Sequence, residues 1–598
     1  MKHFSIYLCS LLIFSNIANA TTPIDWQKLL HYEKKGQKHI SLIENDEYFL
    51  STNGRFSPLD ELNTSIKQFN SENDTKKCDF PARFIYLKQQ NLVKGNLDNC
   101  KDYQQYLNDL QAKSITMLFT NAYMSNPSSL FGHTLFRIDT KRKGSQLLAH
   151  GANFGADTQN DTGVLYALNG VYGKYFGTFT IKPYYDVINL YNNIENRDIW
   201  EYELDLTDTE QELFLALIWE LKQAKIRYYF FTKNCSYVLL SILEAARPSL
   251  DLKNNFNLKS IPLSTLKAVN KENLIKSTNY RPSRQSKITH RYNQMTSPQK
   301  EALINIIKNN KLDLNKLNEN EKSDVLETAY QYIQYQYVEG NLELSSYRKK
   351  SLDLLKQRSQ INDNKLYFED LKTGQNPILS HKEHGASFIL GSRNDNFFQE
   401  FSIKPAYNDL LEQSYGMLNG AEINALETKI RHYDNNNKYI LNELNILSIK
   451  SLNGKNIMFS PFSYDINFGL KETFNPKTNK DTLALNLEIG VGEAYNITPN
   501  TLLYIMNVPN ASYGGGLEEN GYLGFGIKAG LYYNNSTFRL HSFAYKNYTT
   551  SHQTKGETYS LETSYSINPN LNLYTKYKIF NTNDFDDEEI LAGIKINF

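Results

Sequence analysis

The sequence is poor in features that would assign it to a common protein class at once. Of its 598 residues, only three are tryptophan and four are cysteine. Beyond Ala20, no stretch reaches the roughly 18 consecutive apolar residues that a membrane-spanning helix needs. The 65 basic and 64 acidic side chains balance, so we expect no nucleic-acid partner. Any integral membrane part must then be a β-barrel.

The first residues, "MKHFSIYLCSLLIFSNIANA", have the pattern of an export signal. Lys2 precedes an apolar run, and the small residues Ala18 and Ala20 stand where a signal peptidase would cut. We therefore predict a cleaved signal peptide over Met1–Ala20 and a mature chain that begins at Thr21.

Export limits what the cysteines can do. Cys9 lies in the signal peptide, which leaves Cys78, Cys100 and Cys235 in a compartment that favours disulfides. Cys78 and Cys100 lie close together in one N-terminal segment and form the natural pair. Cys235 is then an odd thiol that needs an explanation.

The hydrophobic period changes along the chain and suggests four mature regions. Apolar residues three or four apart indicate helices in the first and third regions, and short runs with Gly-rich breaks indicate one sheet followed by two helices in the second. The predicted regions are a helical N-terminal domain over 21–110, an α+β domain over 111–265, a helical connector over 266–380 and a β-barrel over 381–598.

The last region consists of alternating segments of about ten residues, such as "GASFILGSR" and "EILAGIKINF", separated by Asn, Gly and Asp turns. Their number is about twelve, an even number of the kind that exported barrels use. The chain ends on Phe598, and the 42 tyrosines suit aromatic girdles. We predict an antiparallel outer-membrane barrel; the alternative is a soluble sandwich or a lipocalin-like barrel.

Cys235 opens an apparent helix that stops before Pro248, in "YFFTKNCSYVLLSILEAARP". A thiolate is favoured at a helix N-terminus and beside an imidazole, and the backbone donors of Ser236 and Tyr237 are expected to point at the sulfur. The best candidate base is His133, which follows a glycine and opens an apparent strand.

A third polar group should orient that imidazole, and "LLAHGANFG" supplies His150 and Asn153. Asn234 and Ser129 are candidate oxyanion or supporting donors. Taken singly, a cysteine on an apolar helix or a lone histidine is more often structural. Zinc binding by Cys235, His133 and His150 lacks the close ligand spacing of zinc sites, so no metal or cofactor is expected.

The motifs "SSLFGHTLFRID" and "YYFFTKNCSYVLLSILE", with "IKPYYDVINLYNNIENRDIWEYELDLT" between them, resemble the periplasmic domain of Lnb-type lipoprotein N-acyltransferases over about residues 110–265. The resemblance implies a circularly permuted papain-like thiol fold, related to lecithin:retinol acyltransferase-like and NlpC-type proteins. It implies His133 as base and Cys235 as nucleophile. The segment "CDFPARFIYL" looks like a companion module. Lnb-type enzymes carry membrane helices after this domain, whereas this chain carries the predicted barrel.

Three functions compete. The first is an outer-membrane protein whose periplasmic thiol domain transfers or hydrolyses acyl groups of lipids or lipoproteins through an acyl-thioester, with these lipids as partners. The second keeps the same Cys–His pair for a cell-wall peptidase or amidase. The third is a non-enzymatic porin or adhesin whose periplasmic domain is structural.

Overall fold

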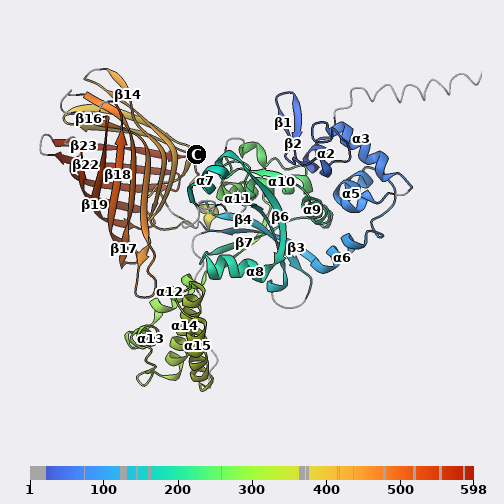
Figure 1. Ribbon diagram of the computed structural model, residues 1–598, viewed down its shortest axis with the longest axis horizontal. Helices are drawn as coiled ribbons and strands as arrows, with labels where there is room; N and C mark the ends of the chain where they lie inside the picture. The colour runs from blue at the N-terminus through green and yellow to red at the C-terminus, as the bar shows by residue number, and fades with distance from the viewer. Residues whose placement is uncertain are drawn as a thin grey trace, which may run out of the picture. The chain divides into compact units, whose positions relative to one another are not determined.

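The computed structural model describes residues 22–598 except 73, 122–130, 143–145, 159–160, 162, 257–258, 362–370, 372–375, 414, 416–417, 436, 476–479, 516, 518–519, 551–554 and 583–585. The predicted signal peptide therefore lies outside the described residues. The chain forms two compact units, residues 1–372 and residues 373–598, and Figure 1 labels their elements.

The first part of the first unit, residues 22–110, is called the N-terminal module below. It is helical as predicted, except for one hairpin. His31, at a φ of 55°, ends the first helix early, and the chain then turns back on itself as two short antiparallel strands. The elements are α2 (Ile24–Leu29), β1 (Tyr32–Lys35), β2 (Lys38–Ser41), α3 (Pro58–Phe69), α4 (Lys76–Asp79), α5 (Pro81–Gln89) and α6 (Lys101–Leu110).

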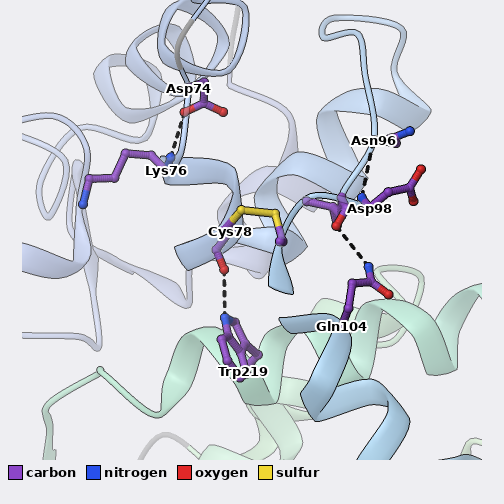
Figure 2. Close-up of a disulfide and its surroundings, with 9 residues drawn as sticks. Asp74, Lys76, Cys78, Asn96, Asp98, Gln104 and Trp219 are labelled. Atoms are coloured by element: carbon purple, nitrogen blue, oxygen red, sulfur yellow. Dashed lines mark hydrogen bonds between the residues drawn. A yellow bond between two sulfur atoms is a disulfide. The ribbon is translucent and has the colours of Figure 1, made fainter. Parts of the chain in front are cut away.

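The predicted disulfide joins Cys78, on α4, to Cys100, which caps the start of α6. Figure 2 shows that the backbone carbonyl of Cys78 also faces the indole of Trp219, whose Nε1–H donates to it at 2.9 Å. The crosslink is thus anchored both within the module and to the helix that carries Trp219.

An antiparallel sheet of seven strands follows, in the order β8-β6-β5-β4-β3-β7-β9. One strand, β9, falls in the region predicted as a helical connector over 266–380. It pairs with β7 and forms one edge of the sheet, so the sheet extends past the predicted boundary at residue 265. The strands are β3 (Ala112–Thr120), β4 (His133–Thr140), β5 (His150–Ala156), β6 (Tyr175–Pro183), β7 (Ile199–Leu204), β8 (Ile226–Tyr228) and β9 (Ile275–Arg281).

Helices cover both faces of this sheet (Figure 1). Leu135 of β4 packs with the α8 segment on one face, and the next residue, Phe136, packs edge-on against Phe214 of α9 on the other, at 5.0 Å between ring centroids. The helices are α7 (Gly163–Tyr172), α8 (Tyr184–Ile188), the π-helical turn η5 (Asn189–Ile194), α9 (Asp208–Leu221), α10 (Cys235–Ala246) and α11 (Pro262–Lys271).

The two helices predicted after the sheet are α9 and α10. Thr207 and Glu210 form a capping box at the start of α9, in which each side chain satisfies a backbone N–H at the helix start. The predicted second helix is α10, which begins at Cys235 and ends before Pro248. The connector contributes α12 (Arg284–Gln294), α13 (Ser297–Asn309), α14 (Glu319–Val338) and α15 (Leu344–Ser359). None of the described helices is long and apolar enough to cross a membrane.

The second unit is a closed antiparallel barrel, as predicted. Its sheet has 14 strands, and without the short β12 (Ala406–Asn408) and β15 (Gly454–Lys455) twelve long ones remain. The barrel closes because its first long strand, β10, pairs not only with the next strand, β11, but also with the last strand, β23. The long strands are β10 (Gly385–Arg393), β11 (Asn396–Lys404), β13 (Ala421–Tyr433), β14 (Lys438–Ser451), β16 (Ser463–Asn475), β17 (Lys480–Thr498), β18 (Thr501–Tyr513), β19 (Gly521–Asn534), β20 (Phe538–Thr549), β21 (Gly556–Asn568), β22 (Leu571–Thr582) and β23 (Asp586–Asn597).

Side chains alternate between the two faces of the barrel wall. On β18, Tyr504 and Met506 are buried in the interior, whereas Leu503 and Ile505 are exposed on the outside. The outer surface carries Leu, Ile, Phe and Tyr side chains, and charged side chains line an interior cavity of about 440 Å³. An apolar exterior around a polar interior is the pattern of membrane barrels.

The barrel interior is occupied near one end by residues 409–413, which follow β12. Leu410 and Leu411 are buried among the inward-facing side chains. The hydroxyl of Tyr532 donates to the Leu410 carbonyl at 3.0 Å, and Asp409 pairs with Lys595 at 2.8 Å. This segment, called the plug below, is thus fixed to the wall by both apolar and charged contacts.

Candidate active site

Cys235 is the first residue of α10, which packs against β4 and β5 of the sheet. Its side chain is buried, and it is the one free cysteine of the described chain. The sulfur lies 3.1 Å from Nδ1 of His133, although the two residues are 102 positions apart in sequence. The predicted thiol–imidazole pair is therefore brought into hydrogen-bonding contact.

Gly132 explains how His133 reaches this place at the start of β4. Its φ is +85°, and a Cβ atom there would lie 2.8 Å from the Thr120 carbonyl and 2.9 Å from the Phe119 ring. A side chain would be strained in this backbone conformation and would also clash with the neighbouring strand. The glycine that precedes the histidine in the sequence motif thus permits the close approach of the two strands.

The third polar position is filled by Asn153. Its Oδ1 accepts from Nε2 of His133 at 2.7 Å, which leaves Nδ1 to face the sulfur. His150 lies elsewhere: the strand register sets it opposite Ile138, five residues further along β4, or about 17 Å away at the usual strand rise. The arrangement is a Cys–His–Asn chain of contacts of the kind used in papain-like proteases.

The charges of this pair favour the ionised form of both groups. Burial alone would raise the pKa of Cys235, but the positive charge and hydrogen bond of His133, with hydrogen bonds from the Thr134 N–H and the Tyr228 hydroxyl, lower it to about 7. The pKa of His133 is raised despite its burial, because the Cys235 charge and hydrogen bond stabilise the imidazolium. A thiolate is the nucleophilic form of cysteine.

The N–H groups at the start of α10 do not contact the sulfur, contrary to the sequence-based expectation. The N–H groups of Ser236 and Tyr237 do not point at the sulfur; they donate to Oδ1 of Asn234, at 3.1 and 3.3 Å. The Asn234 amide nitrogen donates to the carbonyls of Phe230 and Ser260. Asn234 therefore serves as the helix N-cap, with both ends of its amide engaged. Ser129 lies outside the described residues.

Tyr228 is a site residue that the sequence did not single out. It ends β8, and its hydroxyl oxygen accepts from the Cys235 N–H at 3.3 Å. The backbone N–H of the nucleophile and a phenol O–H thus lie together beside the sulfur, where an oxyanion would form during attack on a carbonyl. The one sequence signal that could have found Tyr228 is its place at the start of the motif "YYFFTKNCSYVLLSILE", seven residues before Cys235.

Tyr191 packs against the imidazole of His133, and Arg197 packs against Tyr191 in turn. The Tyr191 ring, on η5, lies 5.6 Å from the imidazole ring, and the Arg197 guanidinium lies 5.3 Å from the Tyr191 ring. Arg197 is fixed by hydrogen bonds to the carbonyls of Thr120 and Asn121. The π-helical turn is an irregularity that often occurs at functional sites, and no motif of the sequence predicts it.

The pair predicts a specific pH dependence. The rate at which iodoacetamide alkylates Cys235 is expected to rise with pH through a midpoint of about 7, because the reactive thiolate forms on deprotonation there, and not near the ordinary value of about 8.5. Peptide mass spectrometry of the folded, full-length protein at a series of pH values measures this midpoint. A midpoint at 8.5 or above would contradict the described pairing.

The site and the barrel together define a class: an α+β domain with a buried Cys–His–Asn arrangement, followed by a closed antiparallel barrel. Family models match the chain in four parts. Residues 102–272 match the Lnb N-terminal periplasmic domain. Three domains of unknown function match residues 19–90 (DUF7843), 278–367 (DUF7842) and 374–596 (DUF7840). The chain thus contains an Lnb-type periplasmic domain.

Solved structures resemble the barrel. The KdgM porin in complex with disordered oligogalacturonate is 12% identical and covers 36% of this chain and 99% of its own, with a TM-score of 0.23. The NanC porin is 8% identical, covers 36% and 100%, and has a TM-score of 0.25. A loop-deletion mutant of OmpT, an outer membrane protein of Vibrio cholerae, is 10% identical, covers 36% and 98%, and has a TM-score of 0.19. No curated protein matches the chain.

A metal centre has no support among the residues that the structure describes. No three His, Cys, Asp or Glu side chains of that part of the chain are grouped as metal ligands. Cys235 and His133 contact each other directly, and His150 is remote from both, so the three residues weighed as a zinc site do not converge.

Proposed function

We propose that the chain is an outer-membrane enzyme whose periplasmic Lnb-type domain transfers or hydrolyses acyl groups through a thioester on Cys235. The observation that carries the proposal is the contact chain from Cys235 to His133 to Asn153, at 3.1 and 2.7 Å. A cysteine that was only packed into the core would not need a buried imidazole held by an amide. The order of the histidine strand before the cysteine helix also agrees with a permuted papain-like fold.

The residues suggest the following steps. The Cys235 thiolate attacks an ester or amide carbonyl, the new S–C bond forms, and the carbonyl oxygen becomes an oxyanion beside the Cys235 N–H and the Tyr228 hydroxyl. As the carbonyl re-forms, the bond to the leaving alcohol or amine breaks, and the His133 imidazolium gives that group its proton. An amine or water then attacks the thioester carbonyl and gives its proton to neutral His133. The new C–N or C–O bond forms, the S–C bond breaks, the acylated amine or free acid leaves, and the Cys235 thiolate beside the His133 imidazolium is regenerated.

A lipid substrate is favoured by the surface of α7, beside the nucleophile loop. The Phe230 N–H, in the loop before Cys235, donates to the Gly170 carbonyl of α7 at 3.0 Å. The same helix exposes large apolar side chains, namely Leu165, Leu168, Val171 and Tyr172. Such an exposed apolar group is uncommon on a soluble protein and suits contact with acyl chains.

The test uses the full-length protein in liposomes, offered diacyl lipopeptide with phospholipid in one arm and muropeptides in the other. Mass spectrometry of the products is expected to show acyl transfer or fatty-acid release in the first arm, and none from a Cys235→Ala variant. Cleavage of muropeptides alone would favour the cell-wall peptidase instead. Turnover in neither arm by folded protein would contradict both enzyme functions.

The plug counts against a porin function and leads to a separate prediction. The purified full-length protein is expected to show no stable porin-type conductance in planar bilayers, because residues 409–413 occupy the barrel interior. Replacing them by a Gly/Ser segment of equal length should open a conducting path, whereas the outward-facing change Ile505→Val should not. Stable conductance of the unaltered chain would show that the plug does not close the barrel.

A further inference from the structure

Glu33, on the β1–β2 hairpin of the N-terminal module, contacts residues on both sides of Cys235. Its Oε2 lies 2.5 Å from the Lys233 ammonium, two residues before the cysteine. Its Oε1 accepts from the Tyr237 hydroxyl, two residues after the cysteine, also at 2.5 Å. One carboxylate thus ties together the loop that leads into α10 and the first turn of that helix.

The same module also fixes the strand that carries Tyr228. Glu44 forms a two-oxygen ion pair with Arg227, at 2.8 and 3.2 Å, and its N–H donates to the Lys225 carbonyl at 2.8 Å. Ile43 pairs with Ile226 as an isolated β-bridge. The module therefore holds the residue next to Tyr228 with one carboxylate and both flanks of Cys235 with the other.

We infer that the N-terminal module is a built-in part of the thiol site, and that Glu33 is the positioning residue through which it sets the sulfur against His133. The inference rests on the proposed function of Cys235. It gives a role to the residues that match a domain of unknown function, 19–90: they hold the catalytic loop and need not touch substrate.

The contacts of Glu33 bear on the geometry of the thiol site and not only on the packing of the N-terminal module. The contact between sulfur and imidazole depends on where α10 begins, and misplacement of reacting groups by about 1 Å is costly. The loop before Cys235 is held on its other side by the hydrogen bond from Phe230 to Gly170. Glu33 supplies the opposing restraint. Its pKa lies below the ordinary value, with the charge of Lys233 outweighing burial, so the carboxylate is ionised at neutral pH.

The test compares Glu33→Lys, Lys233→Glu and the exchanged pair Glu33→Lys/Lys233→Glu in the full-length protein. The readout is the pH midpoint of Cys235 alkylation by iodoacetamide. If Glu33 positions the sulfur, both single variants raise the midpoint by about one unit, which lowers the rate at pH 7 about five-fold, and the exchanged pair recovers most of it. A charge effect acting through space would shift the two single variants in opposite directions.

A matched control is Glu301→Lys, which reverses one charge of the exposed Lys316–Glu301 pair on the connector and should leave the midpoint unchanged. If a charge reversal prevents folding, Tyr237→Phe removes only one hydroxyl from Glu33 and should raise the midpoint by a smaller amount. Unchanged midpoints in folded variants, or opposite shifts, would overturn the inference. A wild-type midpoint at 8.5 or above would instead count against the proposed function.

Discussion

Replacing His133 by alanine is expected to slow alkylation of Cys235 about 50-fold at pH 7. With a pKa of about 7, close to half of the Cys235 side chain is thiolate at that pH. Without the imidazole, burial holds the thiol pKa above the ordinary value of about 8.5, and at a pKa of about 9 only about 1% is ionised. Acyl transfer should fall further, by about 10²- to 10⁴-fold, because the leaving group also loses its proton donor.

Two neighbouring substitutions serve as controls for this result. His150→Ala changes a histidine of the same sheet that lies far from the sulfur, and the alkylation rate should stay the same. Asn153→Ala removes the acceptor that orients the imidazole, and an intermediate loss is expected. If His150→Ala slowed the reaction as much as His133→Ala, the assignment of the third position to Asn153 would be wrong.

Replacing Arg83 by methionine is expected to lower the free energy of unfolding of the periplasmic unit by about 3–5 kcal/mol, as the loss of one partner of a buried ion pair does. The Arg83 side chain is fully buried and pairs with Glu61 at 2.8 Å and Glu220 at 3.3 Å. It also lies between the rings of Tyr48 and Phe80, at 4.4 and 4.0 Å. Methionine fills the space but leaves two buried carboxylates without a cation.

Urea unfolding followed by tryptophan fluorescence measures this loss cleanly. The three tryptophans, Trp26, Trp200 and Trp219, all belong to the first unit, so the barrel contributes no signal. The difference in free energy of unfolding between Arg83→Met and the unaltered protein should become smaller at lower pH, because Glu61 and Glu220, left without a cation, take up protons there. Lys316→Met, which breaks an exposed pair, should change little. A loss of under 1 kcal/mol for Arg83→Met would contradict the buried network.

Much of the fold follows from local patterns. The barrel strands alternate with a period of two, and the capping box of α9 and the N-cap of α10 use side chains within three residues of each other. The disulfide joins the two mature cysteines nearest in sequence. Strands β1, β2 and β9 escaped prediction because they are short and polar. Strands β1 and β2 pair with each other, and the position of β9 depends on β7, which is distant in sequence.

The candidate site likewise contains residues that local motifs predict and residues that only the fold brings together. Cys235 and His133 carry a signal in their own motifs, a cysteine at a helix start and a histidine after a glycine. The choice between His150 and Asn153 depends on strand register, and the involvement of Tyr228 and Glu33 depends on how separate elements meet. No periodicity in the sequence encodes those contacts, so only the three-dimensional arrangement reveals them.

The most direct test of the account is mass spectrometry of the Cys235 peptide after the full-length protein has been incubated with diacyl lipids in liposomes. We expect an added acyl group on Cys235, which appears far more slowly in His133→Ala and is absent from Cys235→Ala. Folded protein that alkylates with a midpoint near 7 yet never carries an acyl group on Cys235 would contradict the acyl-thioester.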